Sequence, residues 1–179
     1  MENPWKTLSS RQVYENPWLR LREDKVIRPD GKEGIYSVVD TRLAVGVVAL
    51  TPQNEIYLVG QWRYPLNSYS WEIIEGGGDP GEEAVETAQR ELREEAGLVA
   101  KKWRPLGPEV HLSNCFTSER AVFFVAEELS EVKAEPDETE VLELRKMKFE
   151  ETLAMVQRGE ITDAMSVIAI LRLHSELSK

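Results

Sequence analysis

Apolar residues in the first half of the chain form short runs or alternate with polar ones, a pattern that predicts β-strands. Four such runs are GIYSVVD at 34–40, LAVGVVAL at 43–50, EIYLVGQW at 55–62 and WEII at 71–74. The residues PDGKEG at 29–34 predict a turn between two extended pieces, and TPQN at 51–54 predicts a hairpin connection. Further strands are predicted near 103–106, 121–126 and 141–149.

Helical spacing and capping residues predict three helices later in the chain. The first is expected to begin with Asp79 as cap, Pro80 at the first helical position and Glu82 three residues after the cap. Gly97 is expected to end it. The other two are predicted at 150–158 and 163–177. Because strands outnumber helices and mix with them, the predicted fold class is α/β (mixed α+β).

The last predicted helix carries apolar residues at the i, i+3, i+4, i+7 spacing. They are Ala164, Val167, Ile168 and Leu171. This spacing predicts a stripe that faces the core or a dimer partner.

The first helix places glutamates at and beside its apolar stripe. At about 100° per residue, Ala88, Leu92 and their helical neighbours form one stripe, and Glu95 falls inside it. Glu91 lies at the edge of the stripe, and Glu94 lies beyond Glu91 on the outer flank. A buried, unpaired carboxylate costs several kcal/mol or becomes protonated. Two interpretations remain: the glutamates bind a divalent metal such as Mg²⁺, which the cluster favours, or they form a buried salt bridge with an arginine such as Arg90.

The glycine run 76–78 directly precedes this helix. Glycines allow the backbone to approach a ligand closely, although such a run is also typical of a flexible loop. Its position favours a site at which backbone and glutamates coordinate one metal cluster.

The spacing of residues 76–98 resembles the complete signature of the Nudix hydrolases. The defining residues are Gly76, Glu82, Arg90-Glu91-Leu92, Glu94-Glu95 and Gly97-Leu98. The resemblance implies a Nudix α/β/α sandwich. It also implies hydrolysis of a nucleoside diphosphate linked to another group, assisted by two or three Mg²⁺ or Mn²⁺ ions.

Carried over by position, the resemblance assigns roles to individual residues. Glu91 and Glu95 would be the principal metal ligands, with Glu94 nearby and the carbonyl of Glu75 adding an oxygen. Arg90 would orient a glutamate. Outside this segment, the order NPW…PDGKEGIYSVVD…QWRYP…WEIIEGG is similar to the ADP-ribose and nucleoside-diphosphate-sugar pyrophosphatase branch.

That branch implies a second set of expectations. Residues 1–40 would form an N-terminal β extension involved in homodimerisation, and 41–179 the Nudix domain. Trp5 and Trp18 would stack on a base, or else anchor the extension or the dimer interface. Arg63 would bind the diphosphate, since its planar fork matches two phosphate oxygens; the alternative is an unpaired surface arginine.

The loop HLSNCFTSER at 111–120 carries the remaining candidates. By resemblance, Glu119 is the general base, with Glu94 as the alternative, and Arg120 contacts the substrate. Members specific for ADP-ribose carry a proline where this chain has Asn114. The preferred substrate could therefore be ADP-ribose, GDP-mannose or another nucleotide sugar.

Composition limits the other possibilities. The formal charge of −10 argues against nonspecific binding to nucleic acid or an anionic membrane. With one cysteine, no apolar signal-peptide core and no membrane-length run, we expect a cytoplasmic location. The leading hypothesis is a nucleoside-diphosphate-sugar pyrophosphatase. The alternatives are a housekeeping enzyme for oxidised nucleotides or dinucleoside polyphosphates, and a non-catalytic nucleotide-sugar sensor.

Overall fold

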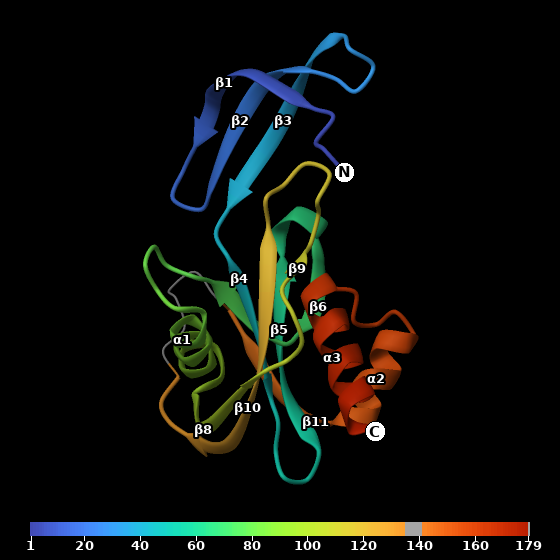
Figure 1. The fold of residues 1–179 in the computed structure, drawn as a ribbon. Helices are drawn as coiled ribbons and strands as arrows, with labels where there is room; N and C mark the ends of the chain where they lie inside the picture. The colour runs from blue at the N-terminus through green and yellow to red at the C-terminus, as the bar shows by residue number, and fades with distance from the viewer. Residues whose placement is uncertain (135–140, 179) are drawn as a thin grey trace. The chain divides into compact units, whose positions relative to one another are not determined.

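The computed structural model describes residues 1–134 and 141–178, and the chain divides into two compact units (Figure 1). The first unit comprises 1–42 and 111–120, and the second comprises the described residues of 43–110 and 121–179. Within the described residues, no helix combines the length and the apolar character needed to cross a membrane.

The first unit is built on an antiparallel sheet in the order β1-β2-β3. Its strands are β1 (Lys6–Glu15), β2 (Leu19–Ile27) and β3 (Glu33–Thr41). The predicted turn between two extended pieces connects β2 to β3, and Gly31 supplies the positive φ of 78° that this turn requires. Every residue of β1 is exposed, so this strand buries no side chain within the chain.

The second unit contains two sheets. The first has the order β7-β4-β10-β8, with β4 (Ala44–Ala49), β7 (Ile74–Gly77), β8 (Leu98–Pro105) and β10 (Arg120–Glu131). The second has the order β11-β5-β6, with β5 (Glu55–Arg63), β6 (Ser68–Glu72) and β11 (Glu143–Lys148). The short elements η1 (Tyr64–Leu66) and β9 (Val110–His111) complete the strands and turns.

Helices lie on both sides of these strands. Figure 1 shows α1 (Ala84–Ala96) on one side, and α2 (Phe149–Gln157) and α3 (Ala164–Leu177) on the other. Helix α1 packs on β4, β7 and β8, and its Ala88 and Leu92 join Val47, Val59 and Ile74 in a buried core. The predicted mixed α/β class with helix, strand and helix layers is therefore confirmed. The involvement of the N-terminal sheet in dimerisation stays a prediction.

Two predicted connections differ from the structure. The run WEII was expected to be one strand, but β6 ends at Glu72 and β7 begins at Ile74, each in a different sheet. The amide of Ile73 leaves the ladder and donates to Ser166 Oγ at 2.9 Å. The turn at 51–54 does form, but the strands that it joins also enter different sheets, so it is not a simple hairpin.

The start of α1 was predicted too early. Helix α1 begins at Ala84 with Glu83 as N-cap, and Glu83 and Glu86 form a reciprocal capping box. The motif at 79–82 makes a separate turn because Gly81 has a φ of +86°, which a right-handed helix cannot contain. Gly97, with a φ of +61°, ends the helix as predicted.

The predicted apolar stripe of α3 is also wrong as a core face. Leu171 is 45% exposed and Ala164 is exposed, whereas the buried residues lie on the adjacent face. These are Met165, Ser166, Ala169, Ile170 and Leu173. Asp163 caps the helix as predicted, accepting a hydrogen bond from the amide of Ser166.

Candidate active site

The glutamates of α1 lie where the helical wheel predicts. Glu95 is 7% exposed and Glu91 is 9% exposed, whereas Glu83 and Glu86 face solvent. Glu94 is intermediate, with 30% of its side chain exposed. The helix therefore holds two buried carboxylates and one half-buried carboxylate within its last two turns.

Arg90 connects these glutamates to the preceding loop. Its Nη1 donates to Glu91 Oε1 at 2.6 Å and to Glu94 Oε2 at 3.1 Å. Its Nε and Nη2 donate to Glu82, and Nη2 also donates to the carbonyl of Gly77. The hydrogen bond from Arg90 lowers the pKa of Glu82 to about 2, and the Glu82 bond is the main cause of a raised pKa for Arg90. The predicted salt bridge with Arg90 therefore forms, to Glu91 and to Glu94.

Strand β7 approaches α1 closely at Gly76. A Cβ atom on Gly76 would overlap the carboxylate of Glu91, so a larger residue at this point requires that carboxylate to move. One residue earlier, the amide of Glu75 donates to Glu95 Oε2 at 3.1 Å. The backbone of β7 and both buried glutamates of α1 therefore form one compact polar centre.

This centre fits a divalent ion by its donor set. Carboxylates and backbone carbonyls are the ligands that Mg²⁺ and Mn²⁺ prefer, and Gly76 brings the backbone within reach of Glu91. Among the described residues, no three acidic, histidine or cysteine side chains already converge as a finished metal site. Glu91 instead accepts from Arg90 Nη1, and Glu95 accepts from the amide of Glu75.

The side chain of Glu75 points away from this centre. Successive residues of a strand face opposite sides, so Glu75 lies across β7 from Gly76 and Glu91. Its Oε1 accepts from Arg63 Nη2 at 2.8 Å, whereas its Oε2 is buried without a hydrogen bond among the described residues. Burial, reinforced by the charges of Asp163 and Glu72, raises the pKa of Glu75 well above its usual value.

Arg63 is not an unpaired surface arginine, because it forms ion pairs with Glu72 and Glu75. Its side chain is 36% exposed, and its guanidinium bonds the buried Glu72 as well as Glu75. Burial alone would lower the pKa of Arg63, but the hydrogen bond to Glu72 and the charges of Glu72, Glu75 and Asp163 raise it. Glu72 was not identified from the sequence. A charged residue inside the apolar run WEII was the available signal, since a buried carboxylate requires a partner.

The aromatic candidates lie in the first unit. Asn3 and Asn16 accept a hydrogen bond from the amide of Trp5 and Trp18 respectively, so the two NPW sequences form the same local turn. Trp5 is 39% exposed and packs edge-on against Tyr36, with ring centroids 5.3 Å apart. Trp18 is 72% exposed and therefore has the larger free ring face.

The loop that carries Glu119 and Arg120 is tied to β3. Val39 donates to the carbonyl of Phe116 at 2.8 Å and accepts from the amide of Ser118 at 3.0 Å. The amide of Glu119 donates to Thr117 Oγ1 at 3.2 Å. Glu119 is half-buried and Arg120 is exposed at the first residue of β10. The loop therefore has a defined conformation within the first unit.

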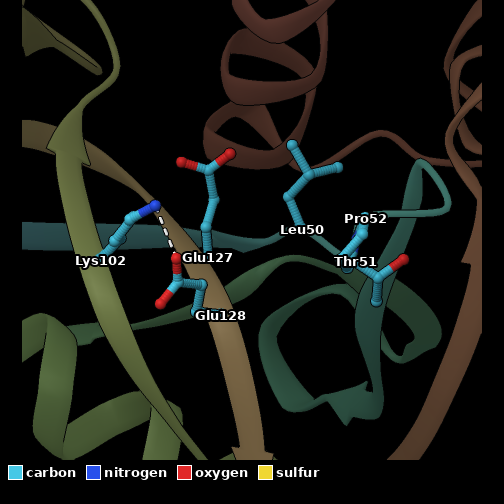
Figure 2. A pocket seen from close by; sticks show the side chains of 6 residues that line it. All are labelled: Leu50, Thr51, Pro52, Lys102, Glu127 and Glu128. Carbon is cyan, nitrogen blue, oxygen red and sulfur yellow. Dashed lines mark ion pairs between the residues drawn. The ribbon is translucent and has the colours of Figure 1, made fainter.

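A shallow pocket elsewhere in the second unit contains none of these residues. Figure 2 shows its lining: Leu50, Thr51, Pro52, Lys102, Glu127 and Glu128. Lys102 and Glu128 are ion-paired across it. The candidate metal ligands predicted from the sequence lie at the polar centre of β7 and α1, outside this pocket.

Family models identify both parts of the chain. Residues 5–39 match the nucleoside diphosphate sugar hydrolase N-terminal domain, and residues 40–165 match the NUDIX domain. The chain belongs to the Nudix family, and the predicted resemblance is confirmed. It is a pyrophosphohydrolase of that family, whose members generally use divalent metals.

Individual proteins resemble the chain over nearly its whole length. It is 36% identical over 167 residues to a Bacillus subtilis (strain 168) protein named ADP-ribose pyrophosphatase, covering 92% of this chain and 90% of that protein. At 33% identity and the same coverage, it resembles the methanol dehydrogenase activator of Bacillus methanolicus. The crystal structure of an ADP compounds hydrolase matches with a TM-score of 0.86 at 23% identity, covering 97% of this chain and 94% of that one. This last likeness supports the fold alone.

Proposed function

We propose that the enzyme hydrolyses the diphosphate bond of nucleoside diphosphate sugars, giving a nucleoside monophosphate and a sugar phosphate. The observation that carries this proposal is the centre in which Gly76 and the amide of Glu75 meet the buried Glu91 and Glu95. The match of residues 5–39 to the N-terminal domain of nucleoside diphosphate sugar hydrolases supports the substrate class. The name of the Bacillus subtilis relative makes ADP-ribose the first substrate to test.

The metal would be held by Glu91, Glu95 and the carbonyl of Glu75, with Glu94 beside them. Two or three Mg²⁺ or Mn²⁺ ions at this centre would activate water by lowering its pKa and would neutralise the diphosphate. Arg90 then orients Glu91 and Glu94, to which it already donates. Glu82 fixes Arg90 through its Nε and Nη2.

Arg63 would bind a diphosphate oxygen. Glu72 and Glu75 accept from its Nε and Nη2, and no described residue accepts from its Nη1. Nη1 is therefore the donor that remains for a phosphate oxygen, and a charged guanidinium donor forms strong hydrogen bonds to phosphate. We assign a further substrate contact to Arg120, which is exposed at the end of its loop.

Glu119 is our proposed general base, with Glu94 as the alternative. Glu94 already accepts from Arg90, which suits a residue that holds its place beside the metal. A Glu119→Gln and Glu94→Gln comparison separates the two roles. Only the variant lacking the base should lose the acidic limb of the pH–rate profile while retaining metal binding.

A homodimer would cover the N-terminal sheet. All of β1 is exposed, and the sheet shows large apolar side chains such as Leu8, Val13 and Ile35 to solvent. Exposed apolar patches of this kind mark interaction surfaces. Trp18, at 72% exposed, is our stronger candidate for stacking on the base, ahead of Trp5. A cytoplasmic location stays a prediction.

The test is product analysis on a substrate panel with Mg²⁺. The panel contains ADP-ribose, ADP-glucose, GDP-mannose, UDP-glucose, dinucleoside polyphosphates and 8-oxo-dGTP. Equal amounts of nucleoside monophosphate and sugar phosphate support the proposal, and the ranking shows which sugar and base Asn114 permits. Turnover of the last two classes alone would indicate a housekeeping enzyme. Binding of nucleotide sugars without any turnover would indicate a sensor.

A further inference from the structure

Glu72 is a buried carboxylate that serves one guanidinium. Glu72 is 2% exposed and lies at the end of β6, where the chain passes from one sheet to the other. Arg63 Nε donates to both of its oxygens, at 2.9 and 3.0 Å, and Arg63 Nη2 donates to its Oε2. Gln61 adds a longer bond of 3.3 Å to the same Oε2. Glu72 therefore contacts one whole edge of the arginine fork.

This contact determines the direction of Arg63. An arginine side chain has many rotamers, whereas a two-point hydrogen bond along the Nε–Nη2 edge fixes the plane of the guanidinium. Glu75 Oε1 accepts a further bond from Nη2 at 2.8 Å, so a second carboxylate also holds the guanidinium. Nη1 donates to neither carboxylate, nor to any other described residue.

The backbone around Glu72 is itself held from a distant part of the chain. The next amide, of Ile73, donates to the fully buried Ser166 Oγ on α3. Ser166 is in turn bound through its amide to Asp163, the cap of the same helix. A rigid anchor of this kind is what a residue that aims another side chain requires.

We propose that Glu72 is a positioning residue for the hydrolytic reaction: it holds Arg63 so that Nη1 meets the diphosphate of the substrate. This inference rests on the proposed function of Arg63. Glu72 contacts neither the substrate nor the reacting atoms, and it acts only through the arginine.

A purely stabilising ion pair is the competing explanation. Buried ion pairs add little net stability, because desolvation offsets most of their attraction. Arg63 also keeps 36% of its side chain exposed, although a residue used only for packing would bury it. Partial exposure together with fixation by two carboxylates suits a group that binds an anion.

The test is a double-mutant cycle with Glu72→Gln and Arg63→Lys. Lysine keeps the positive charge but lacks the fork, so Arg63→Lys removes the geometry that Glu72 imposes. We expect kcat/KM on the best nucleotide sugar to fall between about tenfold and a hundredfold in each single variant. The kcat/KM of the double variant should be no lower than that of the less active single variant, because both changes remove the same interaction. Glu55→Gln, which alters an ion-paired glutamate on β5 far along the strand from Arg63, should retain wild-type kcat/KM.

The outcomes are distinct. If the losses multiply in the double variant, Glu72 acts independently of Arg63 and the inference is wrong. The same four proteins can be compared by their affinity for ADP, measured by calorimetry with Ca²⁺. This measurement needs no turnover, so it tests Glu72 even if the wild type hydrolyses no nucleotide sugar. If Glu72→Gln does not fold, Glu72→Asp replaces it. Aspartate keeps the negative charge, but its shorter side chain cannot accept from both Nε and Nη2 of Arg63. An unchanged kcat/KM and ADP affinity in Glu72→Asp would then overturn the proposal.

Discussion

Gly76 on β7 faces the carboxylate of Glu91 on α1 with no space for a side chain between them. A Cβ atom built on Gly76 would lie 2.6 Å even from Glu91 Oε2, the more distant carboxylate oxygen. Real Cβ contacts are never so short, so a larger residue must displace either the strand or the glutamate. This pair links the glycine run to the carboxylate helix, two features that the sequence presents separately.

Gly76→Ala should therefore damage the site more than the fold. The added methyl group displaces only the end of the Glu91 side chain, so the free energy of unfolding should fall by only about 1 kcal/mol, the low end of an overpacking cost. Turnover should fall about a hundredfold or more, because Glu91 moves from its place. Gly78→Ala is the milder control, since its Cβ would meet Thr87 Oγ1 at 3.2 Å and that side chain would have to move by only a few tenths of an ångström. Activity should be measured at a temperature at which both variants are fully folded. Equal losses of turnover in Gly76→Ala and Gly78→Ala would then refute this account of Gly76.

Arg90 should stabilise the metal-free enzyme. It neutralises Glu82, Glu91 and Glu94, so in Arg90→Gln these carboxylates repel one another. Thermal unfolding in a chelator should show a loss of about 1 to 3 kcal/mol. Added Mg²⁺ should restore part of that loss, because a ligand that binds only the folded state stabilises it.

The exposed Arg93, on the same helix, provides the control for this effect. Arg93→Gln should change stability little, with or without Mg²⁺. Equal Mg²⁺-induced shifts in Arg90→Gln and Arg93→Gln would contradict a role for Arg90 among the metal ligands.

Glu82 predicts a particular acid dependence. Its pKa is lowered from 4.5 to about 2 in the folded protein by the bond from Arg90. Because the folded-state pKa is depressed, the Glu82 contribution is fully present above pH 4.5 and disappears as the pH falls toward 2. Unfolding free energies of wild type and Glu82→Gln should differ by about 1 kcal/mol near neutral pH and converge through that window. If the difference between the two unfolding free energies grew as the pH fell, the depressed pKa of Glu82 would be contradicted.

Local patterns predicted most of the elements and the burial of Glu95. Alternation located most of the strands, and the helical wheel placed Glu95 inside the apolar stripe because that stripe depends only on residues of the same helix. The face of α3 could not be predicted in this way. That helix is apolar on more than one side, and only its packing decides that Ile170 is buried while Leu171 is not.

Two leucines of α3 test that correction directly. Leu173 is fully buried, so Leu173→Ala should lower the free energy of unfolding by about 2 to 5 kcal/mol. Leu171 is 45% exposed, and Leu171→Ala should cost well under half as much. Urea denaturation of both variants measures the contrast. Equal losses would show that the stripe predicted from the sequence is buried after all.

The sequence also could not reveal the surroundings of Glu72 and Arg63. They are nine residues apart, but their contact depends on β6 pairing with β5 before the chain changes sheets at Ile73. At that change the amide of Ile73 donates to Ser166, 93 residues further along. Interactions over such separations leave no periodic trace in the sequence.

The most direct test of the central claim is the Mg²⁺ dependence of nucleotide-sugar hydrolysis in wild type, Glu95→Gln and Glu86→Gln. Both changes are isosteric and on the same helix, and glutamine at 86 still supports the capping box. If the buried glutamates of α1 hold the catalytic metal, Glu95→Gln should lose at least about a hundredfold in turnover at saturating Mg²⁺, and Glu86→Gln should match wild type. Wild-type turnover in Glu95→Gln would contradict the claim, because the buried carboxylate would then serve only the fold.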